Sequence, residues 1–205
     1  WEPEDLAEGS TDVAFLPTIP LNSGPYTKEQ ILAFAGGDSL ACFGKGYEAL
    51  GSHKNSPRIP SGLALQVDEV LAFDLKGGPN KCGYLKARKQ LSSQEWFFKA
   101  HFLNDPCMPA ALIGAGCFQA ISFYMTACGL TEGKDGYKFS PIANQSFKYT
   151  GGGQVGIEEQ YLIYEVFAQS LSNGDQPFME ATVLVTTSSG TKVLVTEIGV
   201  QLLEP

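Results

Sequence analysis

The stretch from Pro106 to Thr131 contains no charged residue, and it restricts the possible folds more than any other part of the chain. It is long enough to cross a bilayer, but Pro109, Gln119 and Ser122 interrupt it. Segments typical of strands lie before and after it. Pro109 suits the first position of a helix, where its missing N–H costs nothing. We therefore expect a core helix from Pro109 to about Gly129, wrapped by a sheet, and no membrane span.

Strand patterns occupy much of the remaining chain. Between Gly83 and Leu91, polar and apolar residues alternate with Lys89 as the one misfit, which indicates a strand with one face in water. Short polar turns, Asn173-Gly174-Asp175 and Ser189-Gly190, separate later runs as hairpin turns do. The strands that we expect span residues 63–75, 83–91, 96–102, 139–149, 158–171, 178–187 and 191–203. Together these features predict an α+β fold in which a largely antiparallel sheet surrounds one long helix.

The first 25 residues mix acidic groups with prolines and do not begin with Met. We interpret residues 1–25 as a linker or N-terminal arm of a piece cut from a longer polypeptide, and residues 26–205 as one domain. Thr27 and Gln30 have the spacing of a capping box, which predicts a helix from there to Gly36-Gly37. A looped stretch over residues 43–60 follows, and we interpret its polar His53 as non-catalytic.

The net charge of −8 argues against a nucleic-acid partner, because phosphate binding needs a basic surface. It would also repel an acidic carrier protein unless the chain had a local basic patch. Two interpretations remain open for the basic residues Lys81, Lys86, Arg88 and Lys99. They form such a patch, or they belong to an ordinary solvated face.

The five cysteines are odd in number and include no close CxxC pair, and there are only two histidines. This pattern lacks the ligand spacing of a zinc site, so we expect no metal. It is typical of buried thiols in a reducing compartment, and the acidic first residues do not resemble a secretory signal. We therefore expect a cytoplasmic protein.

His101 lies between an aromatic run, Trp96 to Phe102, and the proline that opens the long helix. Histidine titrates near neutrality, and the first N–H groups of a helix can stabilise developing negative charge. A base beside such a receptor is suited to removing a proton next to a carbonyl. His101 is therefore the candidate catalytic residue.

The sequence His101-Phe102-Leu103-Asn104-Asp105-Pro106-Cys107-Met108-Pro109 resembles the active-site segment of the hot-dog-fold 3-hydroxyacyl-acyl-carrier-protein dehydratases, in particular the 3-hydroxydecanoyl type. Their pattern is HFxGDPVMPG followed by a helix. Weaker similarities are Arg58-Ile59-Pro60, Gln119 and Lys148-Tyr149-Thr150-Gly151. Related domains occur in polyunsaturated fatty acid synthases and polyketide synthases. The resemblance implies a hot-dog fold, substrates carried on the phosphopantetheine of acyl-carrier protein, no other cofactor, and pairing with a second hot-dog domain or with another copy of the chain.

In that family the histidine removes the C2 proton, and an Asp or Glu early in the helix helps to expel the C3 hydroxyl. The position that corresponds to this acid is Ala115, which cannot donate a proton. Milder departures are Asn104 and Ala110 in place of glycines, and Cys107 in place of valine. The backbone N–H of Ala110 can still polarise a thioester carbonyl.

Three functions remain open at this point. A neighbouring hot-dog domain supplies the acid and the chain is half of a dehydratase, or the chain is an enoyl-thioester isomerase, which needs no such acid. Alternatively, it is a non-catalytic module that binds carrier protein or completes a dimer. Other hot-dog chemistry, such as thioester hydrolysis, is a more distant option.

Three further residues complete the candidate site. Cys107 and Gln119 are candidate substrate-binding residues together with Ala110, although Gln119 could equally bond across a domain interface. Asp105 precedes a proline, and we interpret it as a turn-forming residue rather than a substitute acid.

Overall fold

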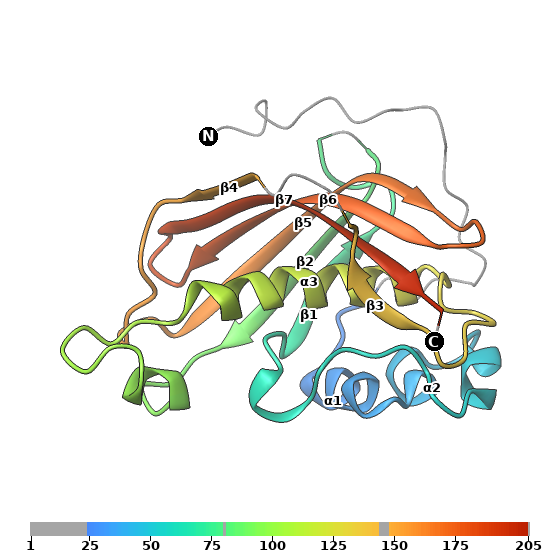
Figure 1. Cartoon of the computed structure of the whole chain (residues 1–205), viewed down its shortest axis with the longest axis horizontal. Helices are drawn as coiled ribbons and strands as arrows, with labels where there is room; N and C mark the ends of the chain where they lie inside the picture. Colours follow the sequence, from blue (N-terminus) through green and yellow to red (C-terminus); the bar gives the residue numbers. More distant parts are fainter. Residues whose placement is uncertain (1–23, 80, 144–147, 205) are drawn as a thin grey trace.

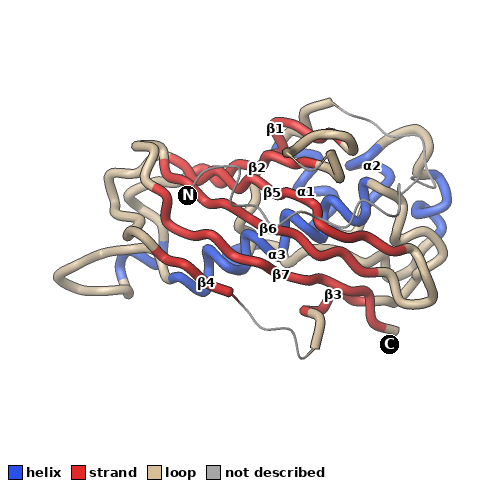
Figure 2. Tube along the Cα trace, turned by 90° about the horizontal axis from the view of Figure 1, so that it is seen from above, coloured by secondary structure: helices blue, strands red, loops and turns tan. Residues whose placement is uncertain are grey.

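The computed structural model describes residues 24–79, 81–143 and 148–204, and it shows an antiparallel sheet wrapped around one long helix, α3 (Figures 1 and 2). The predicted α+β fold is therefore confirmed. The expected arm, residues 1–25, lies almost wholly outside the described residues. Within these ranges the sheet has seven strands in the order β1-β2-β5-β6-β7-β3, and β4 also pairs with β7. The strands are β1 (Glu69–Asp74), β2 (Tyr84–Gln90), β3 (Lys138–Pro141), β4 (Lys148–Gly151), β5 (Tyr161–Ser172), β6 (Phe178–Thr187) and β7 (Lys192–Leu203).

Helix α3 spans Ala110–Ala127 with Pro109 as its N-cap, close to the predicted bounds. Its length and composition would allow it to cross a membrane, but 67% of it is buried within the domain. The hydroxyls of Ser122 and Thr126 donate to backbone carbonyls one turn earlier, so they are hydrogen-bonded inside the core. Helix α3 is therefore the core helix of this domain, as predicted.

Two short helices, α1 (Lys28–Gly36) and α2 (Ser39–Phe43), lie on the side of α3 away from the sheet (Figure 1). The capping box of Thr27 and Gln30 is present, and Gly37 ends α1 with φ +94°. The rings of Phe34 and Phe43 pack against Phe123 with centroids 5.8 and 5.0 Å away. The stretch expected to be a loop contains the end of α2 and a 3₁₀ helix, η2 (Glu48–Ser52).

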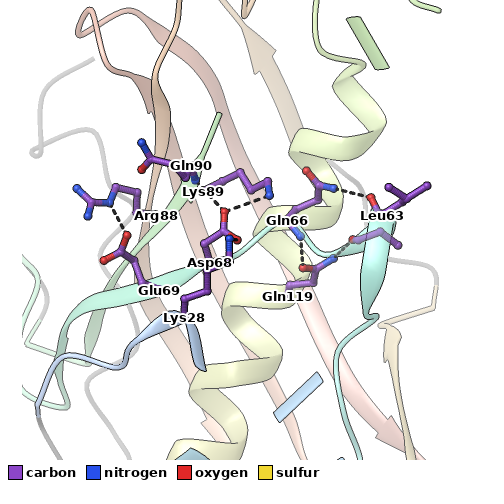
Figure 3. A network of polar contacts seen from close by, with 10 residues as sticks. Lys28, Leu63, Gln66, Asp68, Glu69, Arg88, Lys89, Gln90 and Gln119 are labelled. Atoms are coloured by element: carbon purple, nitrogen blue, oxygen red, sulfur yellow. Dashed lines mark hydrogen bonds and ion pairs between the residues drawn. The ribbon is translucent and has the colours of Figure 1, made fainter. Parts of the chain in front are cut away.

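The misfit Lys89 in β2 has a partner in the interior (Figure 3). Its ammonium lies 3.1 Å from the carboxylate of Asp68, which is 4% exposed. Asp68 also accepts a hydrogen bond from the backbone N–H of Gln90 and lies 3.4 Å from the ammonium of Lys28. The pair satisfies two charges that would otherwise be costly to bury.

The hairpins β5–β6–β7 are confirmed, and β6 has the predicted bounds. Two other strand predictions need correction. Residues 63–75 form a strand only over Glu69–Asp74, after a 3₁₀ turn, η3 (Gly62–Ala64). Residues 139–149 do not form one strand, because β3 and β4 each make a short separate pairing with β7.

Candidate active site

The segment before His101 is a 3₁₀ helix, η4 (Trp96–Lys99), and not the predicted strand. Adjacent Phe97 and Phe98 are both buried, whereas a strand would turn them to opposite faces. Their rings pack edge to face, 4.7 Å apart. The high strand propensity of aromatic residues is therefore overridden by tertiary packing. The chain that follows η4 leads from His101 to Pro109, the N-cap of α3.

The ring of His101 is half-buried and held through its Nδ1 atom, which lies 3.0 Å from the carbonyl oxygen of Cys107. A carbonyl can only accept a hydrogen bond, so Nδ1 carries the proton in the neutral imidazole. Nε2 then has a free lone pair. This is the tautomer that a general base needs.

Cys107 closes the loop over residues 101–107, which we call the histidine loop. Its backbone N–H donates to the carbonyl of His101 at 2.7 Å, and its Sγ lies 3.6 Å from His101 Nδ1. Burial raises the pKa of the Cys107 thiol, and nearby Asp105 raises it further. The thiol is therefore protonated at neutral pH, which disfavours a nucleophilic role.

The histidine loop and the residue after it contact the connection between β4 and β5. Cys107 lies opposite Gly156 in an isolated antiparallel bridge, and the N–H of Met108 donates to the carbonyl of Val155 at 2.9 Å. No pattern in the sequence signals this contact, because it joins segments almost 50 residues apart.

The start of α3 provides hydrogen-bond donors beside the loop. Ala110 is exposed and is the first residue of the helix, so its N–H has no acceptor within the helix. The helix dipole adds partial positive charge there. These are the properties of a receptor for a developing oxyanion.

An apolar pocket of about 290 Å³ opens between the first half of α3 and strand β7. Its helical wall consists of small side chains, and it shares Ala110 with the helix start. The residues that line it are Ala110, Ala111, Gly114, Cys117, Leu194, Thr196 and Ile198.

Gln119 lies away from the histidine loop and is 1% exposed. Its Oε1 accepts from the N–H of Gln66 at 2.7 Å, and its Nε2 donates to the carbonyl of Ala64 at 2.8 Å (Figure 3). Both ends of the amide bind backbone within the chain, which favours a role in holding residues 64–66 over contact with substrate. Ala115, one turn earlier, presents only a methyl group.

The tip of the loop is a turn in which Phe102 and Asp105 exchange backbone hydrogen bonds of 3.1 and 3.3 Å. This geometry fits the turn-forming interpretation of Asp105. Phe102 is 57% exposed and Leu103 is 90% exposed, so these two side chains form a small apolar rim at the tip of the loop. In the described part of the chain no three potential metal ligands cluster.

Comparison with known proteins shows which family the chain matches. Residues 59–196, more than half of the chain, match the FabA-like domain. Over 118 residues the chain is 30% identical to one of the subunits of a polyunsaturated fatty acid synthase from Thraustochytrium sp. (strain ATCC 26185 / S-3). That match covers 56% of this chain and 8% of the relative.

Solved structures with similarity to the chain include the dehydratase heterocomplex ApeI:P from Xenorhabdus doucetiae, with a TM-score of 0.47, 10% identity, and coverage of 71% of this chain and 86% of that one. Another is the thioesterase HI1161 from Haemophilus influenzae, with a TM-score of 0.40, 10% identity, and coverage of 59% and 72%. From the match over residues 59–196, the chain belongs to the FabA-like domain family and has the hot-dog fold of that family.

Proposed function

We propose that this domain supplies the base of a dehydratase that acts on 3-hydroxyacyl thioesters carried by acyl-carrier protein. The observation that carries the proposal is the hydrogen bond from His101 Nδ1 to the Cys107 carbonyl, which leaves Nε2 free beside the start of α3. The similarity to part of a polyunsaturated fatty acid synthase supports the class of reaction.

In the proposed reaction, Nε2 of His101 takes the proton from C2 of the substrate. The electron pair passes into the thioester carbonyl, whose oxygen is stabilised by the N–H of Ala110. Re-formation of the carbonyl creates the C2–C3 double bond and breaks the C3–O bond. The hydroxide leaves as water once an acid donates a proton.

Ala115 cannot be that acid, so we propose that a second hot-dog domain provides it. General acid help contributes about 10²–10⁴ in rate, and the isolated chain therefore has little activity. The exposed rim of Phe102 and Leu103 gives such a domain an apolar surface to cover.

The substrate requires no cofactor other than the phosphopantetheine arm that carries it. The pocket between α3 and β7 is apolar, as an acyl chain requires. A cytoplasmic location is consistent with the cysteines, none of which is paired in a disulfide: Cys42, Cys82, Cys107, Cys117 and Cys128.

The test uses the full parent protein and a 3-hydroxyacyl carrier thioester. We expect His101→Ala to abolish formation of the 2-enoyl product. His53→Ala is the matched control, because the other histidine hydrogen-bonds Ser56 in a separate loop and its loss should leave turnover unchanged. Full dehydratase activity in the pure isolated chain would exclude a shared site. Unchanged turnover in the His101 variant would instead favour a non-catalytic module.

The absence of an acid at position 115 also favours a second candidate, an isomerase that moves the double bond from C2 to C3. This reaction needs a base and an oxyanion receptor but no departing hydroxide. Incubation of the chain with a 2-enoyl carrier thioester distinguishes the two, because only the isomerase forms a 3-enoyl product.

A further inference from the structure

A second buried carboxylate, Glu159, lies in the connection between β4 and β5 and was not among the candidate site residues. It is 7% exposed. The turn between β6 and β7 surrounds it with donors: Ser189 donates from its Oγ at 2.6 Å and from its N–H at 3.1 Å, and the Oγ of Ser188 donates as well. The carboxylate is thus tied by three hydrogen bonds to a hairpin about 30 residues away in sequence.

Glu159 is ionised at neutral pH. Burial would raise the pKa of its carboxyl, but hydrogen bonds from Ser188, Ser189 and Thr187 outweigh burial, and the pKa is lowered. Charged acceptors make stronger hydrogen bonds than neutral ones. These hydrogen bonds therefore hold the connection between β4 and β5 firmly against the turn between β6 and β7.

A turn and a β-bridge connect Glu159 to the histidine loop. The N–H of Glu159 donates to the carbonyl of Gly156 at 3.3 Å, closing a turn. Gly156 lies opposite Cys107 in the antiparallel bridge. The carbonyl of Cys107 accepts the hydrogen bond from His101 Nδ1.

We propose that Glu159 is a positioning residue for His101, acting through the turn and the bridge that hold the Cys107 carbonyl in place. The carboxylate fixes the turn from outside, and the carbonyl fixes which nitrogen of the imidazole carries the proton. Without the attachment, the Cys107 carbonyl becomes free to move and the imidazole samples both tautomers. This role rests on the proposed function only where turnover is measured.

The two histidines allow a direct test by long-range ¹H–¹⁵N spectroscopy of the imidazoles in the whole chain. We expect His101 in the unaltered protein to show one tautomer with the proton on Nδ1. In Glu159→Gln its two nitrogens should move toward averaged shifts, because an amide N–H₂ group takes the place of a carboxylate oxygen that accepts from Ser188 or Ser189. The signals of His53 serve as an internal reference.

Glu132→Gln is the matched control, because Glu132 is exposed and follows the C-terminal end of α3, whereas the carboxylate of the nearer Glu158 lies against Gly156. It should leave His101 unchanged. A folded Glu159→Gln protein with the His101 spectrum of the unaltered chain would overturn the proposal, as would an equal shift in Glu132→Gln. If circular dichroism shows Glu159→Gln unfolded, Ser189→Ala decides: a smaller shift in the same direction supports the role, and an unchanged spectrum overturns it.

In the active parent protein, Glu159→Gln should lower kcat about 10- to 100-fold with little change in KM, since misplacement of a reacting group by about 1 Å has effects of this size. A parent protein that performs no dehydration would contradict the proposed function alone. The imidazole spectrum would still decide the role of Glu159.

Discussion

At the residue scale, two buried carboxylates of this domain are stabilised in different ways. Asp68 is balanced by cations, whereas Glu159 is held by hydroxyl and amide donors. Neither lies in the segment from His101 to Pro109 that carries the resemblance. In the proposed positioning role, the orientation of His101 depends on Glu159 through the contacts that hold the Cys107 carbonyl.

Removal of the buried cation should cost far more than removal of its neighbour. We expect Lys89→Ala to lower the free energy of unfolding by about 3 kcal/mol, because it removes the main partner of a buried carboxylate. Arg88→Ala breaks a half-exposed pair with Glu69 and should cost less than about 1 kcal/mol. Urea denaturation of both variants measures the difference, and equal losses would contradict the assignment.

The lowered pKa of Glu159 predicts how stability depends on pH. An unfolded glutamate titrates near about 4.3, so the contribution of Glu159 is complete above that pH. It is lost as pH falls through the lower pKa of the folded state, because the folded carboxylate resists protonation. Unfolding free energies between about pH 3 and pH 7 should fall more steeply on acidification in the unaltered chain than in Glu159→Gln. Parallel curves would argue against this sign.

At the element scale, α3 combines in one helix a wall of the apolar pocket, the proposed oxyanion receptor and much of the core packing. The sequence predicted its existence and approximate ends from the uncharged run and Pro109. The sequence could not show which of its glycines faces open space and which faces a neighbour, because that depends on the strands packed around it.

Two glycines of α3 should therefore respond in opposite directions to the same change. A methyl group on Gly116 would overlap the phenol ring of Tyr164, and we expect Gly116→Ala to destabilise by about 1–3 kcal/mol. Gly114 has no atom within 4 Å of such a methyl, so Gly114→Ala should stabilise by about 0.5–1 kcal/mol through helix propensity. Thermal unfolding should give midpoints on opposite sides of the unaltered chain, and a shift of the same sign in both would be incompatible with this packing.

At the scale of the whole molecule, the proposed site is half complete, because α3 carries Ala115 at the position where the resemblance to the dehydratases implies an acid. In a pair of identical chains neither site would contain one. A paired domain with an acid would complete a single site around this chain's His101.

Restoring the acid gives a prediction for the isolated chain. If two copies pair as the resemblance implies, Ala115→Asp should raise dehydration of a 3-hydroxyacyl carrier thioester by at least about 10² over the unaltered chain. Ala115→Asn has the same shape without the acid and should give no gain, and Ala115→Asp combined with His101→Ala should be inactive. A gain in the Asn variant would show that the acid is not the missing group.

Local patterns in the sequence were enough to predict the core helix and the hairpins from β5 to β7, and a contiguous motif indicated the fold family and made His101 the candidate base. The three-dimensional packing was needed to show that residues 96–99 form a 3₁₀ helix, that Gln119 binds residues 64–66, and that Lys89 pairs with Asp68. The attachment of the histidine loop through Gly156 and Glu159 was also out of reach. Each of these depends on contacts between distant segments, and such contacts leave no periodic pattern in the chain.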